Sequence, residues 1–515
     1  METELTLKVP ADELERLRSH PMLTEHALGE PVEHHLVDTY YDTPDRALWK
    51  AGLTLRVRAD GPRWIQTVKS AENGAKSGAK SRANSGAGSL HRRGEWECEL
   101  LDAAPQPGML AAQVEPAHVA ELLRSAAIAA ELAPQFQNTT HRTTWRIALA
   151  AGQEVECALD AGDIAAGARH AAIAELELEL KKGDPAQLFK LALDLHHAVP
   201  LQVASGSKAA RGYALLDSTP LRAHKAAPVR LRAKMTLEQA FITIGANCLA
   251  QLESNVPGVL GRDVESLHQM RVGLRRLRAL VDMFADLVQP PSVVSEGLDW
   301  LAGELGAARD WDVLGGSTLD SIAGLDPATL RRAAETRAEA LHRQLAQTLR
   351  APHFTGVLLQ VGGWLHGRGW REEGELDKHS PLAAPAGRGI RPLLRKAEKR
   401  LDKRVDGLDT NDAHARHRTR IAAKKARYAA EFFQDLLPSK RVKPYVGRLA
   451  KLQDELGMLN DFAVADRLLD ELKGSNAQVA RQAAYARGFL AASTAARSAR
   501  LGKSLASVAG RRIGG

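Results

Sequence analysis

Polar side chains, all but one of them charged, recur at every second position in three segments of the first 180 residues. The segments are Glu2-Thr-Glu4-Leu-Thr6-Leu-Lys8, Arg56-Val-Arg58 and Glu175-Leu-Glu177-Leu-Glu179. Because residues i and i+2 of a β-strand share one face, each segment predicts a strand whose polar face carries mostly one sign of charge. Neighbouring carboxylates suit a hard divalent cation such as Mg²⁺ or Mn²⁺, and neighbouring guanidinium groups suit phosphate oxygens. These residues therefore favour a domain that binds a polyphosphate together with a metal ion.

The alternative for any one of these strands is an ordinary half-buried strand whose charged face meets water. A solvent-exposed face usually mixes the two signs, so that neighbouring strands can pair. Here the signs are separated, and the intervening residues are mostly apolar, as at Leu176 and Leu178. A closed barrel would accommodate this pattern, since its charged faces would line a wet tunnel and its apolar faces would pack outward.

A second set of residues that could do chemistry lies in the C-terminal half and occurs twice. His268-Gln-Met-Arg271-Val-Gly-Leu-Arg275-Arg276-Leu-Arg278 matches His417-Arg-Thr-Arg420-Ile-Ala-Ala-Lys424-Lys425-Ala-Arg427, with the histidine and the basic residues at the same offsets. At about 100° per residue, the histidine and three of the basic residues share one helix face. Like charges three and four residues apart repel each other. A repeated stripe without interleaved acids therefore favours a bound anion over a solvated surface.

The scarcity of aromatic residues narrows the ligand of these stripes. Only 4% of the residues are Phe, Trp or Tyr, whereas proteins that hold single-stranded nucleic acid usually stack its bases on aromatic rings. A ligand with phosphates and no bases is therefore expected, and nucleic acid is not. Metal binding by the histidines is disfavoured, because neither repeat supplies a second histidine at i+4.

The two sets of residues lie in differently patterned parts of the chain. Short alternating segments, typical of strands, end near residue 217, and long Ala/Leu/Arg-rich segments with helical spacing follow. We therefore predict a strand-rich domain at 1–217, a linker at 218–230 and an all-helical domain at 231–510. The Gly- and Ser-rich stretch 71–89 is expected to be a flexible loop of the first domain.

The helical part contains an internal repeat. Besides the basic stripes, Glu304-Leu-Gly-Ala-Ala-Arg309-Asp310 matches Glu455-Leu-Gly-Met-Leu-Asn460-Asp461. The two matches occur in the same order, shifted by 149 and 151 residues. We predict two pseudo-symmetric helical bundles, at about 231–370 and 390–510.

Composition restricts the class of protein. The 515 residues exceed one ordinary domain, and the formal net charge of +8 favours polyanionic partners. The sequence has no run of about 18 apolar residues that would predict a membrane span, and its charged start does not resemble a secretory leader. The cysteines Cys98, Cys157 and Cys248 show no disulfide or metal-binding spacing. A cytoplasmic protein with no membrane partner is expected, and its oligomeric state is left open.

The strand-rich domain resembles the CYTH family, the triphosphate tunnel metalloenzymes. The matching segments follow the family's order over nearly the whole domain: Glu2-x-Glu4, Tyr40-Tyr-Asp-Thr-Pro44, Leu53-Thr-Leu-Arg56-Val-Arg58, Gln66-Thr-Val-Lys69, Arg93-Gly-Glu95, Arg142, Ala158-Leu-Asp160, Glu175-Leu-Glu177-Leu-Glu179 and Ser207-Lys208-Ala-Ala-Arg211-Gly-Tyr213. The resemblance implies an eight-stranded antiparallel tunnel of the α+β class and hydrolysis of a triphosphate with Mg²⁺ or Mn²⁺. The segment Tyr40–Pro44 also has a plain structural interpretation, a strand that ends in a turn before the proline.

The resemblance implies roles for individual residues as well. The implied metal ligands are Glu2, Glu4, Asp160, Glu175, Glu177 and Glu179. The implied phosphate clamp is Arg56, Arg58, Lys69, Arg93, Arg142, Lys208 and Arg211. Glu4, Lys8 and Glu177 are the expected catalytic residues. The family signature E-x-E-x-K has Thr6 at its fifth position here, so Lys8 would have to reach back along the strand, or the site is weakened or specialised for another polyphosphate.

The helical domain resembles the CHAD family, conserved-histidine helical domains that often follow a CYTH domain. The resemblance implies a groove that binds inorganic polyphosphate through both repeats. The implied binding residues are His268, Arg271, Arg275, Arg276 and Arg278 in the first repeat and His417, Arg420, Lys424, Lys425 and Arg427 in the second. The segments Arg309-Asp310-x-Asp312 and Leu459-Asn460-Asp461 complete the resemblance. Their aspartates are expected to hold basic residues in place rather than to bind metal.

Together these observations predict a multidomain protein, an antiparallel β tunnel followed by an all-α domain of two bundles. The expected function is metal-dependent hydrolysis of inorganic triphosphate or short polyphosphate, tethered to a polyphosphate-binding module. A non-catalytic polyphosphate-binding protein associated with polyphosphate granules is the first alternative, in which Thr6 marks a disabled site. A nucleoside- or RNA-triphosphatase or a cyclase is the second alternative.

Overall fold

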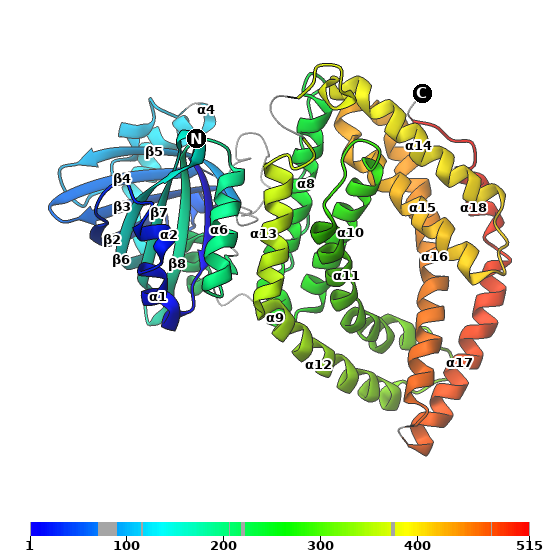
Figure 1. Cartoon of the computed structure of the whole chain (residues 1–515). Helices are drawn as coiled ribbons and strands as arrows, with labels where there is room; N and C mark the ends of the chain where they lie inside the picture. The colour runs from blue at the N-terminus through cyan, green and yellow to red at the C-terminus, as the bar shows by residue number, and fades with distance from the viewer. Residues whose placement is uncertain are drawn as a thin grey trace. The chain divides into compact units, whose positions relative to one another are not determined.

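The chain forms two compact units in a computed structural model (Figure 1). Unit 1 comprises residues 1–224, 253–257 and 350–368, and unit 2 comprises residues 225–252, 258–349 and 369–515. The structure describes residues 2–70, 90–114, 117–204, 206–217, 222–371, 376–474 and 476–513, without the side chains of residues 2, 91–93 and 151. The predicted loop 71–89 and the start of the predicted linker therefore lie outside the described residues.

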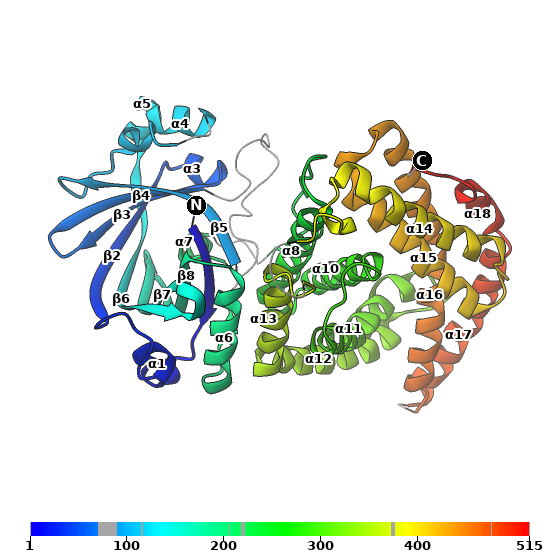
Figure 2. The ribbon, with the colours of Figure 1, turned by 45° about the horizontal axis from the view of Figure 1, so that its top comes forward.

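The described part of unit 1 contains an antiparallel sheet of nine strands, one more than the eight expected from the sequence. The strands are β1 (Glu2–Lys8), β2 (Val32–Asp42), β3 (Leu53–Asp60), β4 (Arg63–Ser70), β5 (Leu90–Leu100), β6 (Ala133–Leu149), β7 (Gln153–Ala166), β8 (Arg169–Lys182) and β9 (Gln202–Val203). Their order is β5-β4-β3-β2-β6-β7-β8-β1-β9, and β5 also pairs with β1. Eight strands therefore close into a ring (Figure 2), and the two-residue β9 is the extra strand.

Strand β1 closes the ring and is paired on both edges. Residues 4–8 pair with β8 on one edge, and on the other edge residues 2–5 pair with β5 and residues 7–8 with β9. Leu5 and Leu7 are fully buried and alternate with polar residues. A shift of one residue would exchange the two faces of the strand, so the buried leucines specify the register.

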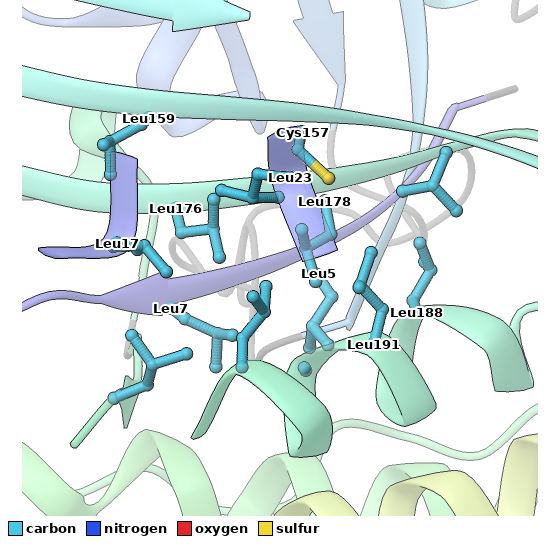
Figure 3. Packing of buried hydrophobic residues seen from close by; sticks show 14 of the residues in the cluster. Leu5, Leu7, Leu17, Leu23, Cys157, Leu159, Leu176, Leu178, Leu188 and Leu191 are labelled. Carbon is cyan, nitrogen blue, oxygen red and sulfur yellow. The ribbon is translucent and has the colours of Figure 1, made fainter. Parts of the chain in front are cut away.

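Leucines on the outward faces of β1 and β8 pack beneath helix α6 (Ala186–Ala198). Figure 3 shows this cluster, which includes Leu5, Leu7, Leu176, Leu178, Leu188 and Leu191. Burying one leucine side chain contributes about 1.5–3 kcal/mol. The alternation thus places apolar side chains outside the ring and leaves the polar faces of the same strands inside.

Asp42, in the Tyr40–Pro44 segment, connects the end of β2 to two helices. Its carboxylate accepts hydrogen bonds from the backbone N–H groups of Leu48 and Trp49 at 2.9 Å and from the Tyr213 hydroxyl at 2.8 Å. The first two belong to α3 (Ala47–Lys50) and the third to α7 (Lys208–Leu216). The structural interpretation of this segment is confirmed, and it fixes α7, which packs on β6, β7 and β8.

The remaining helices of unit 1 are short, except one that comes from far along the chain. They are α1 (Leu14–Arg18), α2 (Pro21–Thr24), α4 (Ala117–Arg124), α5 (Ala126–Glu131) and α13 (Pro352–His366), with 3-10 turns at Ala11–Glu13, Pro107–Leu110 and Ala150–Gly152. Helix α13 packs on α6: the rings of His366 and Phe189 stack with centroids 5.5 Å apart, and His196 Nε2 lies 2.8 Å from the Pro352 carbonyl oxygen. Residues 350–368 therefore complete the tunnel unit although they follow much of the helical sequence.

Unit 2 is helical. Its helices are α8 (Leu237–Ser254), α9 (Val256–Leu260), α10 (Val264–Met283), α11 (Ser292–Val313), α12 (Ala328–Arg350), α14 (Ala386–Asp406), α15 (Ala413–Phe432), α16 (Ser439–Leu472), α17 (Ala477–Ser498) and α18 (Gly502–Val508), with a π-helical turn at Leu314–Thr318 and 3-10 turns at Pro381–Ala383 and Gln434–Leu436. Helices α8 and α9 extend in part into residues assigned to unit 1.

The internal repeat is visible in the helix boundaries. Helices α10 and α15 are both 20 residues long. Each is preceded by an aspartate, Asp263 or Asp412, whose side chain caps the first turn by accepting a backbone hydrogen bond. Because the two basic stripes lie on these two helices, equivalent stripe residues occupy equivalent helical positions.

Candidate functional site

The ring of unit 1 encloses a cavity of about 520 Å³ whose described lining is dominated by charge. Nine carboxylates line it: Glu4, Asp38, Glu95, Glu97, Glu156, Asp160, Glu175, Glu177 and Glu179. Six cationic side chains line it: Arg56, Arg58, Lys69, Arg142, Lys181 and Lys208. They come from every strand of the ring and from α7. The acid row of β8 and the arginine pair of β3 thus face one enclosed space rather than bulk water.

Arg142 and Lys208 form ion pairs with the carboxylates of β7 and β8 in the cavity. Arg142 donates to both oxygens of Asp160, at 2.7 and 2.6 Å, and to Glu177 Oε2 at 2.5 Å. Lys208 Nζ lies 2.5 Å from Glu177 Oε1, 2.8 Å from Asp160 and 3.1 Å from Glu175. Burial alone would favour the neutral acid, but the two cations hold the pKa of Glu177 well below its usual value. Glu177 is therefore ionised in the neutral range.

The arginines of β3 are fixed by a buried aspartate of β2. Arg58 donates to both oxygens of Asp38 at 2.7 and 2.9 Å, and Arg56 lies 3.5 Å from the same carboxylate. Asp38 is 3% exposed. Despite this burial, Arg56 and Arg58 hold the pKa of Asp38 far below its usual value. Lys69 is paired with Glu95 at 3.0 Å on the neighbouring strands.

Three glutamates face one another across β1, β8 and β7. Glu4 is directly opposite Glu179, and Glu179 is directly opposite Glu156. Burial, together with the Glu156 and Glu4 charges, raises the pKa of Glu179, although Lys181 opposes the shift. Lys181 Nζ lies 2.8 Å from Glu179 and 3.3 Å from Glu156. Like charges placed directly opposite in a sheet repel each other. Lys181 offsets this repulsion only in part, because it pairs with Glu179 and Glu156 but supplies a single positive charge.

The first strand departs from the expected arrangement of its charges. The Thr6 hydroxyl donates to Glu4 Oε1 at 2.7 Å, and both residues line the cavity. Lys8 is not in the described lining; burial and then Arg211 lower its pKa. Arg211 pairs with Glu175 at 2.7 Å from outside the described lining.

Two expected residues cannot be placed. The side chains of Glu2 and Arg93 lie outside the described residues, although their backbones pair directly across β1 and β5. Among the residues that the structure does describe, no three acidic, histidine or cysteine side chains are grouped as a metal centre. Most of the lining carboxylates pair with cations instead, whereas Glu4 accepts a hydrogen bond from Thr6.

Sequence reasoning gave no role to five charged residues of the described lining. Lys181 continues the alternation of Glu175, Glu177 and Glu179 by one more step, so the spacing contained the signal. The other four are Asp38, Glu95, Glu97 and Glu156. Asp38 has no such signal, since the alternating positions beside it hold Leu36 and Tyr40.

In unit 2, α10 and α15 bring four cations of the two stripes together. Burial lowers the pKa of Arg271, and the neighbouring Arg275 and Arg420 charges contribute. Burial also lowers the pKa of Arg420 and, to about 7, that of Lys424, with Arg275 contributing to both shifts. The charges of the two stripes therefore act on one another, and the four residues Arg271, Arg275, Arg420 and Lys424 are called the central cluster below.

The repeated Glu-Leu-Gly motif makes room for the first arginine of each stripe. A Cβ atom at Gly306 would lie 3.3 Å from Arg271, and one at Gly457 would lie 3.7 Å from Arg420. Arg271 crosses α11 at this point and donates to the Leu305 carbonyl oxygen at 2.6 Å. The match between Glu304–Asp310 and Glu455–Asp461 is therefore explained in part by the glycine that each segment places beside an arginine.

Four other stripe residues have partners outside the central cluster. Arg276 donates to Gln251 and Asn247 at 2.8 and 2.9 Å. Lys425 pairs with Asp282 at 2.9 Å, Arg278 with Asp299 at 2.5 Å, and Arg427 with Glu431 at 3.4 Å. The structure therefore does not place these four in the central cluster.

The histidines and aspartates of the two motifs lie around the cluster. Burial and then Arg309 lower the pKa of His268, and His417 Nδ1 lies 3.0 Å from Asn460 Oδ1. The motif aspartate Asp312 pairs with His342 at 3.0 Å. Asp310 and Asp461 act electrostatically on the cluster arginines.

Comparison with known proteins agrees with both parts. A CYTH domain model matches residues 1–213, and a CHAD domain model matches residues 243–470. The chain joins a CYTH domain to a CHAD domain. The predicted families and the predicted fold class are confirmed, apart from the ninth strand. No helix within the described CYTH and CHAD residues is long and apolar enough to cross a membrane.

Two relatives illustrate the similarity of each domain. An inorganic triphosphatase from Haemophilus influenzae is 32% identical over 187 residues, which cover 36% of this chain and 47% of that protein. The chain thus spans about half the length of this curated relative. The crystal structure of the CHAD domain from the plant Ricinus communis is 38% identical with a TM-score of 0.52, and the match covers 57% of this chain and 98% of that one.

Proposed function

We propose that the CYTH domain hydrolyses inorganic triphosphate or a short polyphosphate with the help of Mg²⁺ or Mn²⁺. The observation that carries the proposal is the cavity with nine carboxylates and six cationic side chains in its described lining. The excess of carboxylates would repel a polyphosphate that arrived alone. A polyphosphate together with divalent cations matches both sets of side chains. The similarity to an inorganic triphosphatase supports the same ligand class.

The cationic side chains would bind the phosphate chain. Arg56 and Arg58 are held from behind by Asp38, which leaves their remaining N–H groups for phosphate oxygens. Lys69, Arg142 and Lys208 extend this surface across the ring. Since Arg142 and Lys208 are engaged by Asp160 and Glu177, substrate would share these cations with the carboxylates rather than meet free charges.

The carboxylates fit a divalent cation by the chemistry of their donors, because Mg²⁺ and Mn²⁺ prefer carboxylate oxygens. Glu4, Glu156 and Glu179, which repel one another across adjacent strands, would hold it. A bound ion would neutralise phosphate charge and lower the pKa of a water molecule. Thr6 keeps the Glu4 carboxylate oriented by its hydrogen bond.

Phosphate release from inorganic triphosphate with Mg²⁺ or Mn²⁺ tests this proposal. Glu177→Gln removes the charge that positions Lys208 and Arg142, and we expect about a hundredfold slower release. Glu154→Gln is the matched control, because Glu154 pairs with Arg146 outside the described lining. Absence of metal-dependent release from the unmodified protein, or equal loss in both variants, would contradict the proposal. Parallel assays with ATP and a triphosphate-ended RNA test the nucleotide alternative.

We further propose that the CHAD domain binds inorganic polyphosphate at the central cluster. Four cations lie together there with two aspartates nearby. The guanidinium Nε atoms of Arg275 and Arg420 are buried without a hydrogen-bond partner in the part of the chain that the structure describes. An anion would supply the missing acceptors and reduce the repulsion.

Binding of long-chain polyphosphate to the full chain, measured by calorimetry without divalent metal, tests this second proposal. Arg420→Gln should weaken binding about tenfold, since it removes one charge-assisted contact. Arg418→Gln on the same helix is the control, because Arg418 is exposed and lies 3.8 Å from Asp412. Equal affinities of the two variants would place the ligand elsewhere.

A further inference from the structure

Two histidines lie directly opposite each other on the outer face of the sheet of unit 1. His35 of β2 is paired with His141 of β6. The next residues of the two strands, Leu36 and Arg142, line the cavity, so the alternation turns both histidines outward. Both histidines are exposed. They therefore lie on the opposite side of the sheet from the proposed triphosphate site.

The separation of the two rings suits a shared metal ion better than a hydrogen bond. Their Nδ1 atoms are 3.4 Å apart, whereas good N–H hydrogen bonds span about 2.7–3.2 Å. Two nitrogens bound to one tetrahedral Zn²⁺ at about 2.0–2.1 Å are about 3.3–3.4 Å from each other. The ring planes are tilted by 57°, with centroids 4.4 Å apart. The lone pairs of the two nitrogens can therefore converge on one point, as they could not if the ring planes were parallel.

The sheet holds this pair of side chains in place before any ion binds. Strand β2 is also paired with β3, and β6 with β7, so the backbone of both histidines is fixed on either edge. Binding then costs only the rotamer freedom of two rings. Because both rings are exposed, their Nε2 atoms can keep their protons and donate to water. Water molecules complete the coordination, since the described residues contain no group of three acidic, histidine or cysteine side chains that could hold an ion.

We propose that His35 and His141 form a second metal site, which takes a transition-metal dication such as Zn²⁺, Cu²⁺ or Ni²⁺. Imidazole nitrogens suit these ions, whereas the carboxylates of the tunnel suit Mg²⁺ and Mn²⁺. The two faces of one sheet therefore select different classes of metal. An ion bound outside links β2 to β6, the strands that carry Asp38 and Arg142 on their inward faces, and it stabilises the folded ring by mass action.

The test is a calorimetric titration of the full chain with Zn²⁺ in an excess of Mg²⁺, which competes for the carboxylates and not for the imidazoles. His35→Gln and His141→Gln each remove one ligand, and each should abolish the binding of one Zn²⁺ per chain. His170→Gln is the matched control, because His170 is an exposed histidine of β8 whose Nδ1 atom lies 2.6 Å from Asp163. This variant should bind as the unmodified protein does. Retention of the ion in either ligand variant, or its equal loss in all three, would overturn the proposal.

Two further measurements identify the ligands and the place of the ion. Electron paramagnetic resonance of the unmodified protein with bound Cu²⁺, again in excess Mg²⁺, should show coupling to two imidazole nitrogens. A spectrum with oxygen ligands alone would contradict the site even if a variant failed to fold. Zn²⁺ should raise the midpoint of thermal unfolding of the unmodified protein and of His170→Gln, and leave that of His35→Gln and His141→Gln unchanged, because the ion binds only the folded ring. Equal shifts in all four proteins would overturn the link between β2 and β6.

Discussion

Thr6 holds the position in the first strand at which the chain departs most from the family signature. Its side chain is 5% exposed, it lies directly opposite Glu177, and its hydroxyl donates to Glu4. A hydroxyl orients a carboxylate without neutralising it. The tunnel therefore has one cation fewer at the centre of its acidic side than a lysine at this place would give.

We expect Thr6→Lys to raise phosphate release from triphosphate about tenfold, because a cation there would stabilise charge on the reacting phosphate. Thr54→Lys is the control, since Thr54 also lines the cavity but lies on β3 beside the arginines. Steady-state phosphate assays compare the two variants with the unmodified protein. An equal rise in both variants would assign the effect to net charge. No rise in Thr6→Lys would contradict the prediction that Thr6 limits the rate of phosphate release.

At the scale of single residues, the alternation of polar and apolar residues along a strand can be recognised in the sequence. It places Glu175, Glu177 and Glu179 on one face, and the buried leucines between them determine that this face is inward. It does not disclose Asp38, whose role depends on the pairing of β2 with β3. Adjacent residues of a helix also diverge: Arg275 joins the central cluster, while Arg276 turns about 100° away and meets Asn247.

Helix α13 is the element whose place the sequence does not reveal. Its residues follow α12 directly and share the composition of the helical half. Their apolar face nevertheless packs on α6 of the tunnel unit, where Leu359 joins the cluster that contains Leu188. Helical periodicity identifies such a face but not its partner, because any amphipathic neighbour satisfies the same pattern.

The packing of α13 on α6 depends on a glycine, and we expect Gly362→Ala to destabilise the protein by about 1–3 kcal/mol. A Cβ atom at this position would lie 2.3 Å from Phe189 Cε1, and Phe189 is 1% exposed. Gly303→Ala on α11 is the matched control, since its Cβ would meet nothing within 4 Å. That variant should be neutral or more stable by about 1 kcal/mol. Urea unfolding followed by circular dichroism measures both, and equal midpoints would contradict the tight contact.

At the scale of the whole molecule, both units gather charges that repel one another in the absence of ligand. The tunnel collects carboxylates across adjacent strands, and the central cluster collects cations across two helices. The formal net charge of +8 conveys nothing of this separation. Composition therefore predicts polyanionic partners, while the positions of the like charges depend on the closed ring and on the packing of the helices.

The closure of the ring and the position of α13 together determine when unit 1 can be completed during synthesis. Residues 2–8 are made well before their partners in β8 and β9, which are about 170–200 residues later in the chain. The helix that covers α6 is made only after residue 352. Strand β1 therefore lacks its β8 and β9 partners until residue 203 has been made, which exposes hydrogen-bonding groups of the strand to chaperones before it reaches these neighbours.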